Sequence, residues 1–186
     1  MLPYGRQEID EDDIAAVAAV LRGDFLTTGP EIPAFEAAFA SAAGSAHAIA
    51  CNSGTAALHL ALSAVGVGEG DVCIVPAITF MATANAGVYC GARVVFADVD
   101  PETGLMTPDT LKAAMARAGG PVRAVLPVHL AGVPADTPAL AQIAAEAGAR
   151  VVEDSCHALG SLDAEGRPAG ACAHSAAATF SFHPVK

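Results

Sequence analysis

The chain has 186 residues, of which 53% are hydrophobic and 16% are charged, and its formal net charge is -11 at pH 7. This length and composition predict one compact domain with a well-buried core, and they exclude a disordered tail. The acidic balance argues against nucleic acid as a partner, because binding a phosphate backbone requires clustered Lys and Arg. An anionic ligand would instead need backbone amides at the start of a helix.

The cysteines and the N-terminus indicate where the protein works. The five cysteines include no CxxC pair and are odd in number, which indicates reduced, mostly buried thiols in a reducing compartment. The N-terminus has no basic segment followed by an apolar stretch, and no uncharged apolar run suits a membrane span. We therefore expect a cytoplasmic protein that has no membrane partner and no metal site.

Two helices are expected before any sheet begins. Asp10 can cap a helix that runs through Leu21 and is closed by Gly23, because apolar residues repeat there at helical spacing. A second helix is expected to begin near Pro30 and to end at Gly44.

From residue 47 onward, short apolar strands alternate with helices. The strands are expected at 47–50, 72–75, 94–97, 122–128, 150–153 and 175–182, and the helices at 54–65, 81–90, 108–118 and 137–147. A segment rich in Gly and Pro at 163–170 predicts a hairpin or a surface excursion. Apolar strands alternating with helices are typical of an α/β fold with three layers, in which helices cover both faces of a mostly parallel sheet.

Polar segments that follow the apolar runs are the candidate binding residues, because open α/β sheets bind ligands beyond the carboxyl ends of their strands. The first is at 52–55, where the amides of Gly54 and Thr55 and a hydroxyl of Ser53 or Thr55 could hold one anion. An equally good interpretation is that Ser53 or Thr55 only caps the helix. The segment has neither GxGxxG nor GxxxxGK[ST], which argues against a dinucleotide or a nucleoside triphosphate.

Three further segments, at 76–80, 153–157 and 181–186, carry other candidates. Asp154 ends an apolar run, where its carboxylate could keep a ring nitrogen of a ligand protonated, or could simply cap the following turn. His157 could bind near the same ligand, although a lone histidine is more often structural. Lys186 follows an apolar strand, and a desolvated lysine amine can form a Schiff base with a carbonyl. The alternative for Lys186 is a solvated lysine.

Six stretches, taken together, carry a resemblance to a known family. They are Pro-Tyr-Gly-Arg-Gln at 3–7, Phe-Leu-Thr-Thr-Gly-Pro at 25–30, Asn-Ser-Gly-Thr-Ala-Ala-Leu at 52–58, Thr-Phe at 79–80 with Ala-Thr-Ala-Asn at 82–85, Glu-Asp at 153–154 with His-Ala-Leu-Gly at 157–160, and Phe-Ser-Phe-His-Pro-Val-Lys at 180–186. In this order and spacing they resemble the DegT/StrS family of sugar aminotransferases, whose members have the type I fold of enzymes that depend on pyridoxal phosphate (PLP).

The resemblance implies PLP as the cofactor and assigns a role to each matching residue. Lys186 would bind PLP as a Schiff base, Asp154 would pair with its pyridine nitrogen, and Phe80 would stack on its ring. The phosphate would be held by Gly54, Thr55 and Ser181, and His157 would lie near the phenolic oxygen. The residues that would approach the substrate are Tyr4, Asp24, Phe25, Leu26, Thr27, Ser53 and His183.

Within the family, the segments at 4–7, 89–92, 127–132 and 181–186 are most similar to the transaminases of pseudaminic acid biosynthesis. This implies a homodimer that transfers an amino group from L-glutamate to C4 of a UDP-linked 4-keto-6-deoxy sugar, in a pathway to a cell-surface polysaccharide. Alternatives are a different UDP-, dTDP- or GDP-linked keto-sugar, or an inactive or regulatory protein that keeps the fold. A lysine at 186 argues against the dehydratase branch of the family, which has histidine there.

The resemblance also implies parts that follow the lysine in family members, namely a Gly-rich segment and a smaller C-terminal domain. Neither is present among these residues. We therefore expect residues 1–186 to form the N-terminal segment and the PLP-binding large domain, and we expect activity to depend on the further parts.

Overall fold

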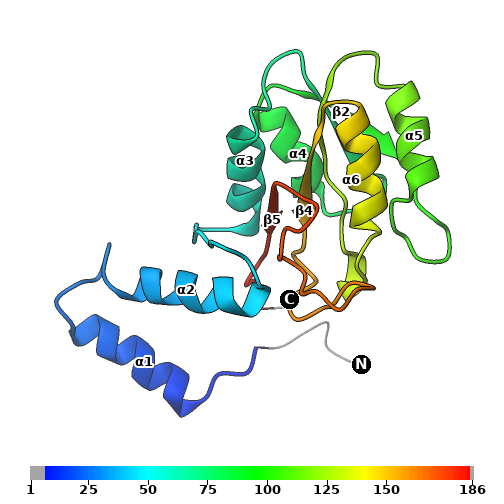
Figure 1. Cartoon of the computed structure of the whole chain (residues 1–186). Coiled ribbons are helices and arrows are strands. Elements are labelled where there is room, and N and C mark those ends of the chain that lie inside the picture. Colours follow the sequence, from blue (N-terminus) through cyan, green and yellow to red (C-terminus); the bar gives the residue numbers. More distant parts are fainter. Residues whose placement is uncertain (1–6, 185–186) are drawn as a thin grey trace, which may run out of the picture.

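The computed structural model describes residues 7–184 of the protein. A parallel sheet of five strands lies at the centre of this part of the chain (Figure 1). The strands are β1 (Val72–Pro76), β2 (Arg93–Ala97), β3 (Val122–Val125), β4 (Arg150–Asp154) and β5 (Ala177–Thr179). They lie in the order β2-β1-β3-β4-β5, and every neighbouring pair is parallel. The predicted α/β fold with a mostly parallel sheet is confirmed.

Two helices cover each face of the sheet, which gives three layers (Figure 1). Helices α3 (Gly54–Ala64) and α4 (Met81–Tyr89) pack on one face, and α5 (Pro108–Ala116) and α6 (Thr137–Glu146) pack on the other. All four lie within a few residues of their predicted bounds. The helix α5 begins at a capping box between Thr107 and Thr110, which accounts for its sharp start.

The two faces of the sheet bury separate apolar clusters, because alternate residues of a strand point to opposite faces. On β1, Cys73 and Val75 face α3 and α4, whereas Val72 and Ile74 face α5 and α6. The large helix residues that are fully buried are Leu58 and Leu62 on the first side and Leu111 and Leu140 on the second. Burial on both faces explains why the strands appear in the sequence as continuous apolar runs.

Helices α1 (Glu11–Arg22) and α2 (Glu31–Ala43) lie outside the three layers (Figure 1). The side chain of Asp10 caps α1, and Gly44 ends α2 in the left-handed conformation with φ 66°. Both helices therefore begin and end where the sequence predicts. No residue of α1 is buried against the rest of the described chain.

Four phenylalanine rings join α2 to the segment that follows β5. The ring of Phe39 meets those of Phe180 and Phe182 edge-on, with centroids 5.0 and 5.4 Å apart. Phe35 contacts Phe182 in the same way at 5.3 Å. Edge-to-face contacts of this kind stabilise beyond the apolar area that they bury. This aromatic cluster therefore fixes where residues 180–182 lie relative to α2.

Several predicted elements differ from the structure. The predicted strand at 47–50 is wrong, because this segment pairs with no strand within residues 7–184, and the amide of Ala50 donates instead to the Glu36 carboxylate at 2.8 Å. The strands β3 and β5 are both shorter than predicted. For β3 the reason is Pro127, which has no amide hydrogen to donate, so the strand ends before it. The hairpin expected at 163–170 is present and is closed by an antiparallel bridge between Leu162 and Pro168.

The five cysteines are free thiols, but the expectation that most are buried is wrong. Only Cys73, in β1, is fully buried, and Cys51 is exposed. Burial raises the pKa of Cys73 to about 12. Within residues 7–184, no helix is both long enough and apolar enough to cross a membrane, and no three His, Cys, Asp or Glu side chains gather as a metal site.

Replacing Phe39 with alanine should loosen the aromatic cluster and lower the free energy of unfolding by about 2 kcal/mol, less than for a fully buried ring. The measurement is urea unfolding followed by circular dichroism. Phe25→Ala is the matched control, because its side chain is 60% exposed, and it should change stability by less than about 0.5 kcal/mol. Equal effects of the two substitutions would contradict the structural role of the cluster.

Candidate active site

A pocket lies at the carboxyl edge of the sheet, between α2, the start of α3 and the segment that follows β5. Six of the predicted site residues line it, and they come from three separate parts of the chain. They are Ser53, Gly54, Thr55, Phe80, Ser181 and His183. The structure therefore brings together residues that are up to 130 positions apart in the sequence, from Ser53 to His183.

The start of α3 offers free backbone amides to this pocket. The Ser53 hydroxyl accepts a hydrogen bond from the amide of Ala56 at 3.1 Å, so Ser53 does cap the helix. The carbonyl of Ser53 accepts from the amide of Ala57 at 2.9 Å. The amides of Gly54 and Thr55 have no carbonyl to bond within the helix, and together with the helix dipole they can hold an anion. Capping by the Ser53 side chain and anion binding by the amides of Gly54 and Thr55 are thus compatible.

Gly54 also permits a close approach by the segment that follows β5. A Cβ atom on Gly54 would lie 3.1 Å from the Cβ of Ser181 and 3.3 Å from the Sγ of Cys156, closer than nearly all such contacts. Because glycine has no side chain, Ser181 can lie directly beside the helix start. Its hydroxyl accepts a hydrogen bond from the amide of His183 at 3.3 Å. The glycine therefore places a hydroxyl next to the two helix amides.

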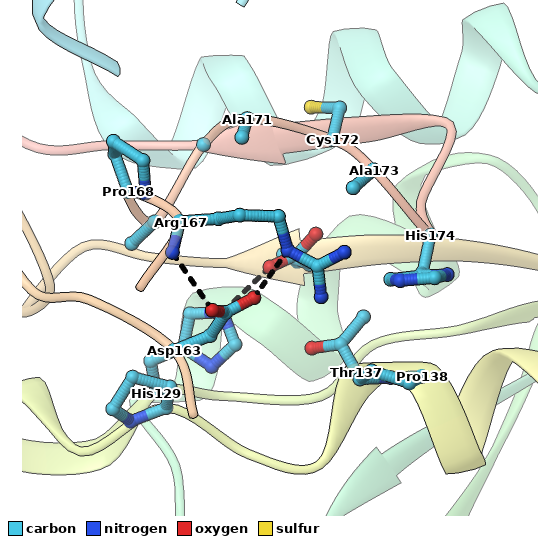
Figure 2. Close-up of a pocket in the computed structure, with 14 residues that line it drawn as sticks. His129, Thr137, Pro138, Asp163, Arg167, Pro168, Ala171, Cys172, Ala173 and His174 are labelled. Atoms are coloured by element: carbon cyan, nitrogen blue, oxygen red, sulfur yellow. Dashed lines mark hydrogen bonds and ion pairs between the residues drawn. The ribbon is translucent and has the colours of Figure 1, made fainter. Parts of the chain in front are cut away.

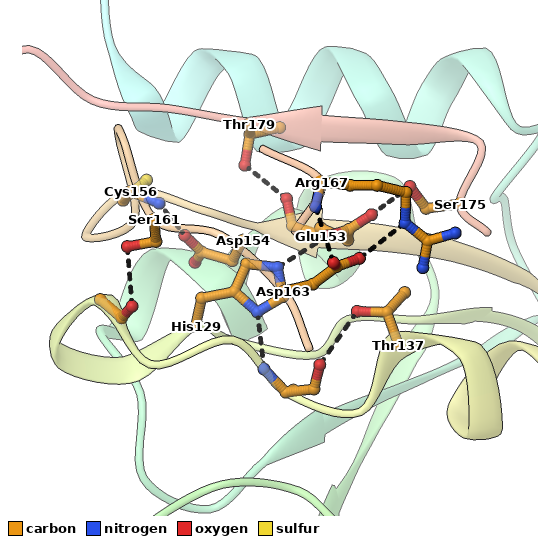
Figure 3. A network of polar contacts seen from close by, with 12 residues as sticks. His129, Thr137, Glu153, Asp154, Cys156, Ser161, Asp163, Arg167, Ser175 and Thr179 are labelled. Carbon is orange, nitrogen blue, oxygen red and sulfur yellow. Dashed lines mark hydrogen bonds and ion pairs between the residues drawn. The ribbon is translucent and has the colours of Figure 1, made fainter. Parts of the chain in front are cut away.

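Asp154 ends β4, and its side chain is only 4% exposed. One carboxylate oxygen accepts a hydrogen bond from the Thr83 hydroxyl at 2.6 Å. The other accepts from the amide of Cys156 at 3.2 Å, which Figure 3 shows beside Asp154. An ionised carboxylate has about four acceptor positions, so Asp154 can still accept from one more donor. Asp154 therefore caps the following turn and also remains able to bind a protonated ligand atom.

Thr83 is a site residue that the sequence reasoning missed. It lies on α4, is fully buried, and makes the shortest described contact to Asp154. Its own oxygen lies 2.7 Å from the hydroxyl of Thr79, which precedes α4. Thr83 lies in the matched stretch at 82–85 but was given no role there, and a polar threonine on a helix that otherwise packs small residues against the sheet was a further signal.

Glu153 lies next to Asp154 but makes its contacts in a separate buried network (Figure 3). Its carboxylate accepts from the Ser175 hydroxyl and lies 2.7 Å from Nε2 of His129. Nδ1 of His129 accepts the amide of Ala135 at 3.1 Å, so Nε2 must carry the proton and donate to Glu153. The amide of His129 donates to the carbonyl of Asp154 at 3.1 Å, and the network therefore supports the backbone of Asp154. The sequence reasoning missed this pair as well.

The hairpin at 163–170 closes over this network (Figure 2). Arg167 donates from its backbone amide and from its guanidinium to Asp163, the latter at 2.8 Å. These hydrogen bonds, led by the backbone one, lower the pKa of Asp163, and the bond to Asp163 raises the pKa of Arg167. Figure 2 shows both groups above His129 and Thr137 in a small pocket. The hairpin contributes support rather than a binding residue.

The other predicted site residues lie away from the pocket or outside the described chain. Residues Asp24, Phe25, Leu26 and Thr27 are exposed between α1 and α2, and they do not line the pocket. His157 is exposed, and its Nδ1 accepts the amide of Ala131 at 3.4 Å. Tyr4 and Lys186 lie outside the described residues.

The sequence and fold match known proteins over nearly the whole chain. Residues 7–186 match the model of the DegT/DnrJ/EryC1/StrS aminotransferase family. The chain belongs to this family. Its fold is that of the PLP-dependent aminotransferases of fold type I.

Three solved structures illustrate the similarity. An aminotransferase from Psychrobacter cryohalolentis is 34% identical with a TM-score of 0.89, over 99% of this chain and 46% of that one. A Streptococcus pneumoniae protein described as a sugar aminotransferase, in its PLP-form, is 32% identical with a TM-score of 0.90, and the match covers 100% of this chain and 50% of that one. DesI, in the presence of its TDP-sugar product, is 37% identical with a TM-score of 0.87, and the match covers 100% of this chain and 46% of that one. The chain therefore spans about half the length of these family members.

Replacing Gly54 with alanine should force Ser181 and Cys156 away from the helix start. We expect a loss of stability of about 1–3 kcal/mol, typical of overpacking, although alanine is the better helix former. Thermal or urea unfolding measures it. Gly68→Ala is the control, because a Cβ there would meet nothing within 4 Å. A Gly54→Ala protein as stable as the Gly68→Ala protein would contradict the close approach.

Proposed function

We propose that this protein takes part in PLP-dependent transfer of an amino group to a nucleotide-linked keto-sugar. The observation that carries the proposal is the pairing of a buried carboxylate, Asp154, with free helix amides at Gly54 and Thr55 on the same edge of the sheet. The carboxylate suits a protonated ring nitrogen, and the helix amides suit a phosphate. PLP carries both groups, and it is the ligand named in the structure of a family member.

The described residues fit this cofactor. Asp154 keeps acceptor capacity after Thr83 and Cys156 have donated to it. A Cβ on Gly54 would crowd Ser181, so glycine lets Ser181 lie beside the helix amides that would hold the phosphate. Phe80, 66% exposed, lines the pocket with a ring that could stack on the cofactor.

In the proposed mechanism, bound PLP supplies an electron sink that stabilises negative charge on a carbon next to the transferred nitrogen. Asp154 holds the ring nitrogen protonated, which is what makes the ring accept electrons. Gly54, Thr55 and Ser181 would hold the phosphate, and Phe80 would cover the ring. The Lys186 amine removes the proton from the α-carbon of the amino donor, and it later returns a proton to C4 of the sugar.

The finer assignments follow from the family resemblance, and we propose them as such. L-glutamate is the amino donor, and the acceptor is a UDP-linked 4-keto-6-deoxy sugar of the pseudaminic acid type. The nucleotide-sugar is approached by Tyr4, Asp24, Phe25, Leu26, Thr27, Ser53 and His183, and His157 approaches the cofactor's phenolic oxygen. Since Asp24 to Thr27 do not line the pocket formed by one chain, we infer that they act in the site of a second copy or after a rearrangement.

The organisation of the whole protein is part of the same proposal. We infer that residues 1–186 form the N-terminal segment and the cofactor-binding large domain, and that the working enzyme is a cytoplasmic homodimer. The exposed apolar residues of α1, Ile14, Val17 and Leu21, support a further packing partner for that helix. A second candidate function is amination of a dTDP-linked sugar, because DesI was solved with a TDP-sugar product.

The direct test is the visible absorption of the purified protein with PLP, followed by borohydride reduction and mapping of the labelled peptide. We expect a cofactor band in the wild type, with the label on Lys186. Lys186→Ala should lose the label, and Asp154→Asn should weaken PLP binding at least about tenfold, because a charge-assisted hydrogen bond is lost. Thr137→Val removes a hydroxyl that donates to the carbonyl of Ala135 and not to Asp154, and it should bind PLP normally. Absence of any band from the wild type would overturn the proposal.

Glutamate with UDP- or dTDP-linked 4-keto sugars then separates the two acceptors. Preferential amination of the UDP-sugar supports the pseudaminic acid type, and preferential amination of the dTDP-sugar supports the second candidate. A protein that binds PLP but aminates neither sugar would contradict both.

A further inference from the structure

The Asp154 carboxylate is reached by a chain of two threonine hydroxyls. Thr83 Oγ1 lies 2.6 Å from Asp154 Oδ2, and Thr79 Oγ1 lies 2.7 Å from Thr83 Oγ1. Thr83 is fully buried and Asp154 nearly so, while Thr79 is partly exposed at the turn between β1 and α4. The chain therefore runs from the partly exposed turn before α4 into the core.

The chemistry of the groups gives this chain a direction. An ionised carboxylate can only accept hydrogen bonds, and both oxygens of Asp154 do so, from Thr83 and from the amide of Cys156. A hydroxyl has one hydrogen, and Thr83 gives its hydrogen to Asp154. The short contact between the two threonines then requires Thr79 to donate to Thr83. Each hydroxyl thus points its hydrogen toward the carboxylate.

We propose that Thr79 and Thr83 form a hydrogen-bond relay that holds the Asp154 carboxylate in a fixed orientation, with Thr83 as a positioning residue for the cofactor's ring nitrogen. This rests on the proposed function, since it assigns a role toward PLP. Thr83 does not touch the cofactor and acts only through Asp154.

The relay matters because the carboxylate is buried. A buried charge that loses a donor either becomes neutral or turns toward other partners, since the low-dielectric interior penalises an unpaired charge. A reoriented Asp154 could not pair with a protonated pyridine nitrogen. Thr79 reinforces the effect, because a hydroxyl that accepts a hydrogen bond becomes a better donor.

The test is the dissociation constant for PLP, titrated into the full chain by its visible absorption. Thr83→Val removes the hydroxyl but keeps the shape, and it should weaken PLP binding about tenfold, as expected for a lost hydrogen bond to a charged group. Thr83→Ser keeps the hydroxyl and should stay within about threefold of the wild type. Thr79→Val should weaken binding about threefold, because the donor Thr83 remains.

Combining the two valine substitutions gives the sharpest outcome. If Thr79 acts through Thr83, the double variant should bind PLP no more weakly than Thr83→Val alone, because the effects do not add within one network. Thr137→Val is the matched control, since Thr137 is 8% exposed and, within residues 7–184, its hydroxyl donates to the carbonyl of Ala135 rather than to Asp154 or Thr83. It should leave PLP affinity unchanged.

The outcomes separate this inference from the proposed function. A wild type that takes up no PLP overturns both. Uptake by the wild type with equal affinity in Thr83→Val overturns the relay alone, as does weak binding by both Thr83→Val and Thr83→Ser, which would indicate packing rather than hydrogen bonding. Should Thr83→Val fail to fold, the partly exposed Thr79 decides the matter, and unchanged affinity in Thr79→Val overturns the relay.

Discussion

A buried carboxylate needs hydrogen-bond donors, and at Asp154 this requirement arranges the carboxyl edge of the sheet. Its donors come from α4 through Thr83 and from the turn after β4 through the amide of Cys156. The same turn brings Cys156 against Gly54, where α3 begins. One buried charge therefore ties β4 to α4 and, through its turn, to the start of α3, which are the elements that form the proposed cofactor site.

The two neighbouring acidic residues of β4 have different roles, because Glu153 supports the fold and Asp154 is available to a ligand. The Glu153 carboxylate accepts hydrogen bonds from Ser175 and from His129, whose tautomer is fixed by the amide of Ala135. The contacts of Glu153 are therefore structural. Asp154 does not line the pocket at the carboxyl edge of the sheet, but its carboxylate keeps acceptor capacity after Thr83 and Cys156 have donated to it. The aromatic cluster of Phe35, Phe39, Phe180 and Phe182 acts at a longer range, since it holds the segment that carries Ser181 beside Gly54.

Much of the fold is predictable because its signals are local. Apolar runs of four or five residues mark β1 and β2, and Asp10 and Gly44 mark helix ends. The error at 47–50 arose because an apolar extended segment pairs only if a neighbouring strand is available, and here Glu36 takes the amide of Ala50. At the site, Gly54, Phe80 and Ser181 could be grouped from motifs. The contacts of Thr83 with Asp154 and of His129 with Glu153 could not be predicted, although both residues lie in matched stretches, because a side-chain pair 71 or 24 residues apart leaves no local pattern in the sequence.

The central claim is that one edge of the sheet holds a phosphate on α3 and a protonated ring nitrogen on Asp154. A crystal structure of the full chain grown with PLP tests it most directly. The account predicts that the phosphate lies on the amides of Gly54 and Thr55, beside Ser181, and that the ring nitrogen lies within hydrogen-bonding distance of Asp154. A cofactor bound elsewhere, or bound here with its ring nitrogen turned away from Asp154, would contradict the account.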